Sequence, residues 1–384
     1  MSLAECPKQE VSIEQLRAAI IDADSYRHQR TILFALTDGG GNVRARYREV
    51  APPNDVECAD LAQELCSVSQ FSWKPQWLVL INRPLYIVLE AGVLLEEDGT
   101  IIAESVFPST GDKSIARQFG GALNSSNLRR ALNDAPTTDR AVWAPLLSRW
   151  SAVYGHAVTE CLVQNTMFSA LGLSETLFHP IPEYEVAGAQ RIVVSHACCR
   201  LKKFAAPIVK IPRGVFSTAF FKHAALGNLF RQFVDKTNSS AGPNTVEAVE
   251  SGEKIYVSRI GAESRRMTNE PELIARLGDI GFSIFRGQGQ SFERQVAAFR
   301  KASLVVGPYG SGLTNIAFAK PGGTLCELRP LHARGHVRMR VDEYARICGL
   351  MGIFYCAHVS PNDIDADKWE ANIPEILKIA QELS

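Results

Sequence analysis

The 384-residue sequence has no excess of charge of either sign, because 41 Lys and Arg residues balance 41 Asp and Glu residues. A protein that holds nucleic acid or an anionic membrane through its overall field needs such an excess. The composition therefore argues against both classes and leaves room only for a local basic pocket. No apolar stretch approaches the roughly 18 to 20 residues of a membrane span, and the N-terminal MSLAECPKQE lacks the basic start and apolar core of a signal peptide. We therefore expect a cytoplasmic protein.

The cysteines offer no disulfide or metal framework. They are nine in number, an odd count, they are scattered, and no Cys-x-x-Cys pair occurs among them. Cys198 and Cys199 are adjacent, a spacing that suits neither a zinc site nor an ordinary disulfide. We expect reduced thiols that pack in the core.

The length exceeds what a single core usually supports, so two domains are expected. The first part of the chain mixes strands and turns with two helices and one later strand. The predicted strands lie at 31–37, 77–81, 86–105 and 191–196, and the predicted helices at 154–171 and 218–235. The small and polar segment at 236–251, with its Gly and Pro, predicts a linker. We place the domain boundary at 240/241.

After the linker, strands and helices alternate regularly. We predict strands at 254–259, 282–287, 303–307 and 324–328, and helices at 269–280, 291–302 and 311–320. Asn269 and Ser291 are the expected N-caps of the first two helices. Because the turns are short and the strands continuously apolar, the pattern indicates an α/β fold with a parallel sheet covered by helices on both faces.

The segment VVGPYGSGLTN (305–315) places three glycines between an apolar strand and a helix. Ligands of open parallel sheets lie beyond the carboxyl ends of the strands. The start of a helix offers free N–H groups there, and Gly310 and Gly312 remove side chains that would hold a diphosphate away. Simple backbone geometry of the turn is the alternative explanation. The segment matches neither the Gly-x-Gly-x-x-Gly fingerprint nor a Walker loop.

Charged residues near this edge strengthen the anion hypothesis. Glu327 ends the next predicted strand, where a carboxylate can accept hydrogen bonds from ribose hydroxyls. Arg259, Arg265 and Arg266 follow the first strand, and guanidinium groups bind phosphate in a bidentate way. We favour Arg259 and Arg266 over Arg265. The alternative is that these are solvated charges.

These residues together resemble a known family. The segments SR, RRMTNEPELIARLGDIGF and SFERQVAAFRKASLVVGPYGSGLTNIAFAKPGGTLCELRP, within residues 254–330, look like the C-terminal half of glycosyltransferase family 61 and its bacterial relatives in capsular polysaccharide synthesis. WSAVYGHAVTECL (150–162) is similar to the family's Tyr-Gly-His segment, which the resemblance maps onto His156 and Glu160, and 92–105 looks like its N-terminal hairpin. His156 and Glu160 are spaced i, i+4, so on a helix the carboxylate of Glu160 can orient the imidazole of His156.

The resemblance implies a GT-B-like architecture with two Rossmann-like domains. Residues 1–240 would form an acceptor-side domain with a β-rich start, and residues 241–384 a nucleotide-sugar-binding domain. Three positions depart from the family pattern, because Tyr309 replaces a common histidine, Ser311 an alanine and Glu160 an aspartate. Tyr309 leaves both altered donor choice and lost activity open.

The resemblance therefore implies an inverting glycosyltransferase that needs no metal or other cofactor, and we expect a UDP- or GDP-linked sugar as its donor. His156 and Glu160 are the expected catalytic residues. The expected donor-binding residues are Arg259, Arg265, Arg266, Gly307, Tyr309, Gly310, Ser311, Gly312, Thr314, Asn315 and Glu327. The acceptor would be a glycan or a lipid-linked sugar in surface polysaccharide synthesis. A peripheral position at the inner membrane face with membrane-associated polysaccharide machinery is left open.

Two alternatives remain at this point: a nucleotide-sugar epimerase or hydrolase on the same architecture, and a non-catalytic module that binds nucleotide sugar or glycan. Two further clusters are weaker candidates. DIDAD (363–367) resembles a manganese-binding Asp-x-Asp, but capping and solvation explain it better. His332 and His336 are interpreted as the rim of a loop.

Overall fold

The computed structural model describes residues 8–22, 32–89, 92–102, 125–139, 142–144, 147, 151–183, 188–218, 227–240, 253–331, 343–365 and 368–384. The chain forms two compact units. The first consists of Met1–Gly41 and Trp73–Phe233, and the second of Asn42–Ser72 and Val234–Ser384. Residues 42–72, which precede the predicted boundary by far, thus pack with the C-terminal part of the chain. The predicted roles of the two domains remain predictions.

The first unit is built on a mixed seven-stranded sheet in the order β1-β2-β5-β12-β8-β9-β10. Its strands are β1 (Lys8–Val11), β2 (Ile32–Asp38), β5 (Gln76–Ile81), β8 (Val142–Trp143), β9 (Leu177–Pro182), β10 (Arg200–Phe204) and β12 (Gly214–Ser217). A second sheet in the order β11-β6-β7 contains β6 (Leu85–Val88), β7 (Val93–Leu95) and β11 (Ile208–Ile211). The helices are α1 (Ile13–Ile21), α4 (Ser125–Asn133), α5 (Tyr154–His156), η4 (Ala157–Cys161), α6 (Leu162–Ala170) and α7 (Gln190–Ser195).

The core of the first unit forms where β-branched and aromatic side chains meet between these sheets. Val79, Ile87, Trp143 and Phe216 are buried in one cluster. The predicted strand region at 86–105 contains the antiparallel pair of β6 and β7. In the predicted hairpin at 92–105, Leu95 forms an antiparallel bridge with Ile101, and residues 103–105 lie outside the described residues. The predicted strands at 31–37 and 77–81 are confirmed as β2 and β5. Continuous apolar runs therefore predicted these strands correctly.

The predicted strand at 191–196 is wrong, because this segment belongs to the helix α7. Ala189 and Val193 are buried and Arg191 and Ser195 are exposed, which is the four-residue periodicity of a helix. A short apolar run of this kind does not distinguish a strand from a helix segment. The predicted helix at 218–235 corresponds in part to α9 (Asn228–Ser240), and residues 219–226 lie outside the described residues.

The second unit contains a five-stranded sheet in the order β15-β13-β16-β17-β18, and all four neighbouring pairs are parallel. Its strands are β13 (Lys254–Val257), β15 (Ser283–Phe285), β16 (Leu304–Pro308), β17 (Thr324–Pro330) and β18 (Phe354–Ser360). Its helices are α2 (Val56–Leu65), α10 (Glu270–Asp279), α11 (Phe292–Phe299), η5 (Ser311–Phe318), α12 (Glu343–Met351) and α13 (Ile373–Glu382). The small strands are β14 (Arg266–Met267), β19 (Asn362–Asp365) and β20 (Lys368–Glu370), and β3 (Gly41–Arg44) pairs with β4 (Gln70–Trp73). The predicted α/β alternation is confirmed.

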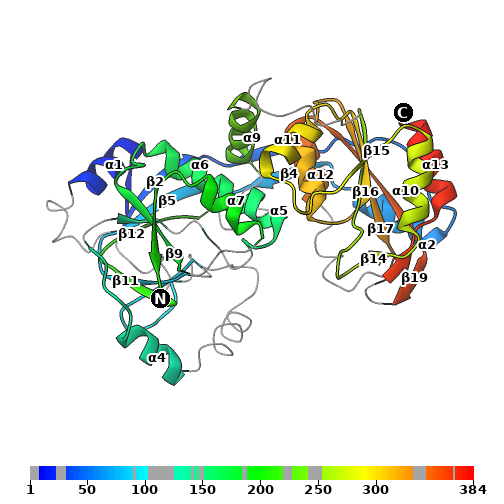
Figure 1. The fold of residues 1–384 in the computed structure, drawn as a ribbon. Helices are drawn as coiled ribbons and strands as arrows, with labels where there is room; N and C mark the ends of the chain where they lie inside the picture. The colour runs from blue at the N-terminus through cyan, green and yellow to red at the C-terminus, as the bar shows by residue number, and fades with distance from the viewer. Residues whose placement is uncertain are drawn as a thin grey trace. The chain divides into compact units, whose positions relative to one another are not determined.

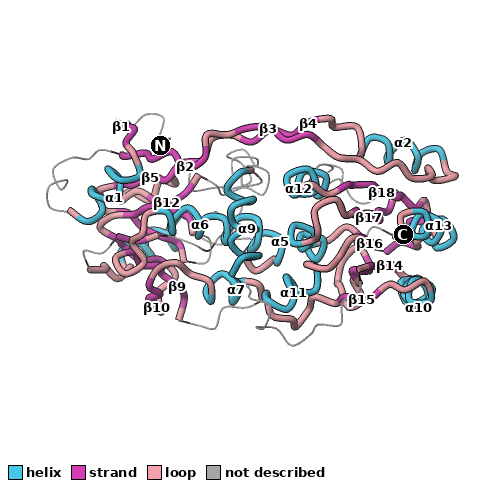
Figure 2. The backbone as a smooth tube through the Cα atoms, turned by 90° about the horizontal axis from the view of Figure 1, so that it is seen from above, coloured by secondary structure: helices cyan, strands magenta, loops and turns pink. Residues whose placement is uncertain are grey.

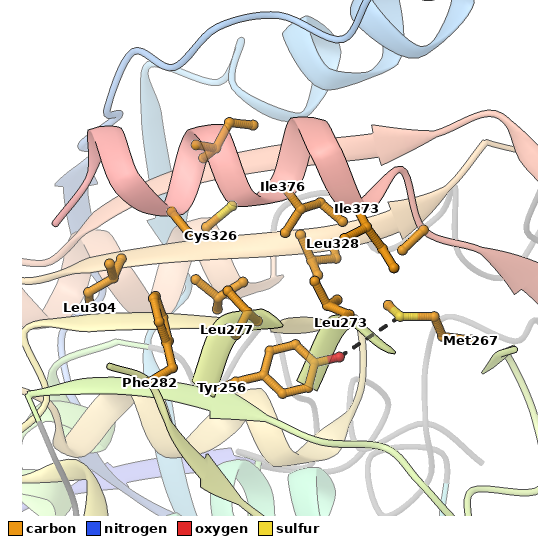
Figure 3. Packing of buried hydrophobic residues seen from close by; sticks show 14 of the residues in the cluster. Tyr256, Met267, Leu273, Leu277, Phe282, Leu304, Cys326, Leu328, Ile373 and Ile376 are labelled. Atoms are coloured by element: carbon orange, nitrogen blue, oxygen red, sulfur yellow. Dashed lines mark hydrogen bonds between the residues drawn. The ribbon is translucent and has the colours of Figure 1, made fainter. Parts of the chain in front are cut away.

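Helices cover both faces of this parallel sheet. α10 and α13 lie on one face, and α11 and α12 lie on the other (Figures 1 and 2). Figure 3 shows the core under α10 and α13, where Leu273, Leu277 and Ile376 pack against Tyr256 and Cys326 of the sheet. Side chains of successive strand residues alternate between the two faces of a sheet. Cys326 faces α10 and α13, so the next residue, Glu327, points to the side of α11 and α12.

Residues 42–72 complete the second unit. α2 packs against β18, and Tyr47 forms a β-bridge with Tyr355. The backbone N–H of Asn54 and its side chain donate to Glu375 Oε1 of α13 at 3.3 and 2.6 Å. Among the helices of the described residues, none combines the length and the apolar character that a membrane span requires.

Candidate functional site

The strand order of the second unit indicates the edge of the sheet at which a ligand is expected. In chain order, β15-β13-β16-β17-β18 reads 2-1-3-4-5, a doubly wound order whose direction reverses between the first and third strands. Connections from those two strands leave to opposite sides, and ligands bind outside their carboxyl ends. The segment after Val257 and the turn after Pro308 lie at this point. These are the segments that contain Arg259 and the three glycines.

Protein groups come close to all three glycines, where Cβ atoms would crowd them. A Cβ on Gly307 would lie 2.9 Å from Val257 Cβ and 3.1 Å from Leu313 Cδ2. A Cβ on Gly310 would overlap the guanidinium of Arg259. Gly310 is the residue before η5 and has an extended backbone. The glycine turn therefore brings Arg259 against the main chain at this edge of the sheet.

Arg259 is held in place by one hydrogen bond from its backbone N–H and one from its guanidinium. Its N–H donates to Glu270 Oε1 at 2.6 Å, and its Nη2 donates to Ser264 O at 3.0 Å. Within the part of the chain that the structure describes, no carboxylate forms an ion pair with the guanidinium of Arg259 or Arg265. Burial, followed by the positive charge of Arg265, lowers the pKa of Arg259. Two like charges are thus kept close together, an arrangement that a bound anion would relieve.

Arg265 and Arg266 are placed differently from one another. The Arg265 guanidinium carbon lies 4.8 Å from the ring centroid of Tyr309, and its backbone has φ = 54°. No other non-glycine residue of the described ranges adopts this left-handed region, which is costly for a residue with a side chain and recurs at functional sites. Arg266 is exposed in β14, where it pairs with Lys368. Arg259 and Arg265 therefore lie at the turn, whereas Arg266 is exposed in β14. Which of the three bind the donor remains a prediction.

Glu327 lies in the middle of β17, because the strand continues to Pro330 instead of ending at the predicted residue 328. It is fully buried and pairs in register with Gly307. Arg329 Nε donates to its Oε1 at 2.5 Å, and the Tyr355 hydroxyl donates to its Oε2 at 2.7 Å. Both carboxylate oxygens therefore accept bonds from the protein, and a ribose would have to compete with them.

Three residues around this site, Arg329, Tyr344 and Tyr355, were not predicted from the sequence. Burial is the largest single influence on the pKa of Arg329 and lowers it, but the charge and hydrogen bond of Glu327 together with Tyr355 and Tyr309 raise the pKa overall. The Tyr344 hydroxyl donates to Gly310 O at 2.7 Å and so fixes the glycine turn. A signal for Arg329 was available, because residues i and i+2 of a strand share a face and Arg329 follows Glu327 by two. No comparable signal pointed to Tyr344 or Tyr355.

The predicted helix after the turn is a 3-10 helix, η5, rather than an α-helix. Leu313 N–H donates to Gly310 O at 2.9 Å, so Ser311 and Gly312 carry the N–H groups that the start of this helix leaves without a partner inside the helix. Both residues are half-buried. Thr314 and Asn315 are fully buried instead, and Asn315 Nδ2 donates to Gln295 Oε1 at 3.0 Å. Their side chains therefore belong to the packing of η5 on α11.

The predicted pair in the first unit is brought together. His156 ends α5 and Glu160 lies in η4, a turn of π-helix, and His156 Nδ1 is 2.6 Å from Glu160 Oε1. Side-chain exposure is 5% for His156 and 1% for Glu160. π-turns are rare and recur at functional sites. A carboxylate next to Nδ1 accepts the Nδ1–H bond, so the tautomer that carries its lone pair on Nε2 is favoured.

The weaker candidates fall partly outside the described residues. His332 and His336 lie wholly outside them, as do residues 366 and 367 of the DIDAD segment. Within the described ranges, no group of three or more His, Cys, Asp or Glu residues is arranged to hold a metal ion. Most of the cysteines that the structure describes are buried, as expected.

Part of the chain matches the model of a known protein family. Residues 154–326 match the family model described as Glycosyltransferase 61. The matched range begins at the start of α5, which contains His156, and ends inside β17, so it includes the helix with the His–Glu pair and the glycine turn. No curated protein matches the chain. The match supports the glycosyltransferase activity predicted from the sequence, an activity that requires a sugar donor and an acceptor.

Proposed function

We propose that the chain is an inverting glycosyltransferase that moves a sugar from a nucleotide-sugar donor to a glycan or lipid-linked acceptor in bacterial surface polysaccharide synthesis. One observation carries the donor side of this proposal. Arg259 and Arg265, without a carboxylate partner among the described residues, converge on the glycine turn at the point where the strand order reverses. Diphosphates bind to such arrangements of guanidinium and backbone N–H groups.

The donor-binding set follows from this geometry. Arg259, Arg265 and the N–H groups of Ser311 and Gly312 would bind the phosphates. Their positive charge would stabilise the nucleoside diphosphate as it leaves, the role that a divalent cation has in other transferases. Glu327 would act by fixing Arg329, since its two oxygens already accept protein hydrogen bonds. The parallel sheet of the second unit supports a GT-B-like architecture.

The acceptor side rests on His156 and Glu160. His156 Nε2 would take the proton of the acceptor hydroxyl, and Glu160 would hold the ring in the required tautomer. The acceptor oxygen would attack the anomeric carbon as the bond from that carbon to the phosphate oxygen breaks. The electron pair leaves with the nucleoside diphosphate. A single displacement of this kind needs one base and one stabilised leaving group, and it inverts the anomeric configuration.

The first prediction tests the pair. His156→Ala is expected to lower kcat about 10²- to 10⁴-fold, the usual contribution of a general base, and to leave the donor Kd unchanged. Glu160→Gln keeps an oxygen that can accept the Nδ1–H bond but loses the charge, so a smaller loss is expected. His196→Ala is the matched control, because His196 is an exposed histidine in the same unit. Wild-type kcat in both His156→Ala and Glu160→Gln would reject the pair as base and orienting group.

The assay is release of the nucleotide, UDP from UDP-linked sugars, GDP from GDP-linked sugars and CMP from CMP-linked sugars, with and without acceptor glycans. A thermal-shift screen identifies the donor first, because a ligand at 100 times its Kd stabilises the folded state by about 2.7 kcal/mol. Release that depends on an acceptor supports the transferase. Release without an acceptor would favour the hydrolase or epimerase, and binding without release would favour a non-catalytic module.

A further inference from the structure

We propose that Tyr309 is a positioning residue whose aromatic ring holds the guanidinium of Arg265 in place for the phosphates of the donor. This inference rests on the proposed function and deepens it. It assigns the role to the ring, whereas the phenol oxygen is the group that would hydrogen-bond a phosphate. Tyr309 is then a support for a binding residue and makes no contact with the reacting atoms itself.

The contacts around Tyr309 carry the argument. The guanidinium carbon of Arg265 lies 4.8 Å from the ring centroid, and that of Arg329 lies 4.5 Å from it. The ring of Tyr344 packs edge-on against Tyr309, with centroids 5.6 Å apart. Tyr309 is 7% exposed. An aromatic ring attracts a cation over its face by about 0.5 to 2 kcal/mol, more as the contact loses water.

The two cations at this ring differ in how they are held. Arg329 is buried in an ion pair with Glu327, which Tyr355 also binds, so its place is fixed by the sheet. Arg265 has no carboxylate partner among the described residues. Its backbone is held in the left-handed region, and its carbonyl accepts a bond from Trp369 Nε1 at 3.3 Å. The backbone thus directs the side chain, and the ring supplies its packing partner.

Charge repulsion explains why a ring is needed here. Arg259, Arg265 and Arg329 surround the same turn, and only Arg329 is paired with a carboxylate in the described residues. Arg265 would gain by turning out to solvent, away from the other two charges. A carboxylate next to Arg265 would hold it but would also neutralise it and repel a phosphate. An aromatic ring holds the guanidinium and leaves its charge available.

The test compares Tyr309→Phe with Tyr309→Leu and uses UDP, GDP and inorganic pyrophosphate as probes in calorimetry. Phe keeps the ring and is expected to bind within about threefold of the wild type. Leu removes the ring, so the guanidinium of Arg265 is no longer held in place for the phosphates, and binding is expected to weaken about ten- to a hundredfold. Equal losses in both variants would assign the role to the hydroxyl and overturn the proposal.

A double-mutant cycle with Arg265→Met shows whether Tyr309 acts through Arg265. If it does, Tyr309→Leu adds no loss of pyrophosphate binding once Arg265 is replaced. Additive losses would overturn the proposal. A separate readout needs no ligand: the NMR resonances of the Arg265 side chain should carry a ring-current shift in the wild type and in Tyr309→Phe that disappears in Tyr309→Leu.

Failure of the proposed function and failure of the role of Tyr309 give different results in these experiments. If the wild type binds none of the three probes, the proposed function is overturned and the donor role of Tyr309 with it. If the wild type binds them and Tyr309→Leu binds equally well, only the role of Tyr309 is overturned. Urea unfolding of each variant checks that the loss of binding is not a loss of folded protein.

Discussion

At the scale of single residues, the missing side chain of Gly310 decides where a positive charge can lie. The guanidinium of Arg259 occupies the volume that a Cβ at this position would take. The Tyr344 hydroxyl holds the carbonyl of the same glycine. Gly310 is therefore the residue through which the strand-to-helix turn and the arginine after β13 are coupled.

Replacing this glycine gives a sharp prediction. Gly310→Ala should displace the Arg259 guanidinium from the turn and weaken UDP or GDP binding about tenfold or more, as expected when a charged hydrogen-bond donor is lost. Gly278→Ala is the matched control, because a Cβ there meets no other atom within 4 Å and alanine favours the helix. Calorimetric titration measures the effect. Unchanged affinity in Gly310→Ala would show that the position of Arg259 does not matter for the nucleotide.

The residues of the turn show what could be predicted at this scale. The glycines were recognised because Gly307, Gly310 and Gly312 follow one another closely between a strand and a helix, where a close approach of some kind is expected. The sequence does not tell what approaches, and here it is Arg259, Val257 and Leu313. The burial of Glu327 against Arg329 could not be predicted either, since it depends on Tyr355 from a strand that is distant in sequence.

At the scale of elements, the second unit was predicted more completely than the first. Its strands are continuous apolar runs between Gly- or Asn-containing turns, so periodicity located β13, β16 and β17 and the helices between them. Residues 191–196 of the first unit misled the same reasoning, because Ile192, Val193 and Val194 favour a strand locally. The helix is stabilised instead by the burial of Ala189 and Val193 on one side of α7.

Helix starts provide a second prediction. Ser291 caps α11 as expected, with its Oγ accepting from Arg294 N–H, and Ser291→Ala should cost about 1 kcal/mol. Asn269 lies at the N-cap position of α10, as expected, but its side chain makes no capping hydrogen bond. Its side chain donates to Ala371 O and accepts from Ala371 N–H, both at 2.9 Å, and so ties α10 to the start of α13. Asn269→Ala should therefore cost about 2 kcal/mol for the two bonds, and Asn269→Asp less, because it keeps the acceptor.

Urea unfolding of these variants measures the free-energy changes. Equal costs for Ser291→Ala and Asn269→Ala would mean that the two bonds to Ala371 contribute no more than an ordinary cap.

At the scale of the whole molecule, each unit contains a buried histidine whose pKa is lowered to about 4. Burial is the cause for both His179 and His358. In the unfolded chain these groups would titrate near the ordinary value of about 6.5. Below that value the unfolded state binds protons that the folded state does not, so stability should fall as the pH drops from about 6.5 towards 4. The loss is about 2 kcal/mol for each histidine at pH 5.

Urea unfolding at pH 7.5 and pH 5 tests this dependence, with His358→Gln as the informative variant. Glutamine does not titrate, so the pH-dependent loss in the second unit should shrink by about 2 kcal/mol whatever the variant costs at pH 7.5. An identical pH dependence in the variant would show that His358 does not contribute.

The membership of residues 42–72 in the second unit has a consequence for how the protein is made. These residues emerge from the ribosome long before β18, against which α2 must pack. At the usual 5 to 20 residues per second, translation from residue 72 to residue 360 takes roughly 15 to 60 seconds. During that time the nascent chain presents the apolar side of α2, with Leu61 and Leu65, without its eventual neighbour. Slower decoding between residues 72 and 360 would lengthen the time for which this segment waits for its partner strand.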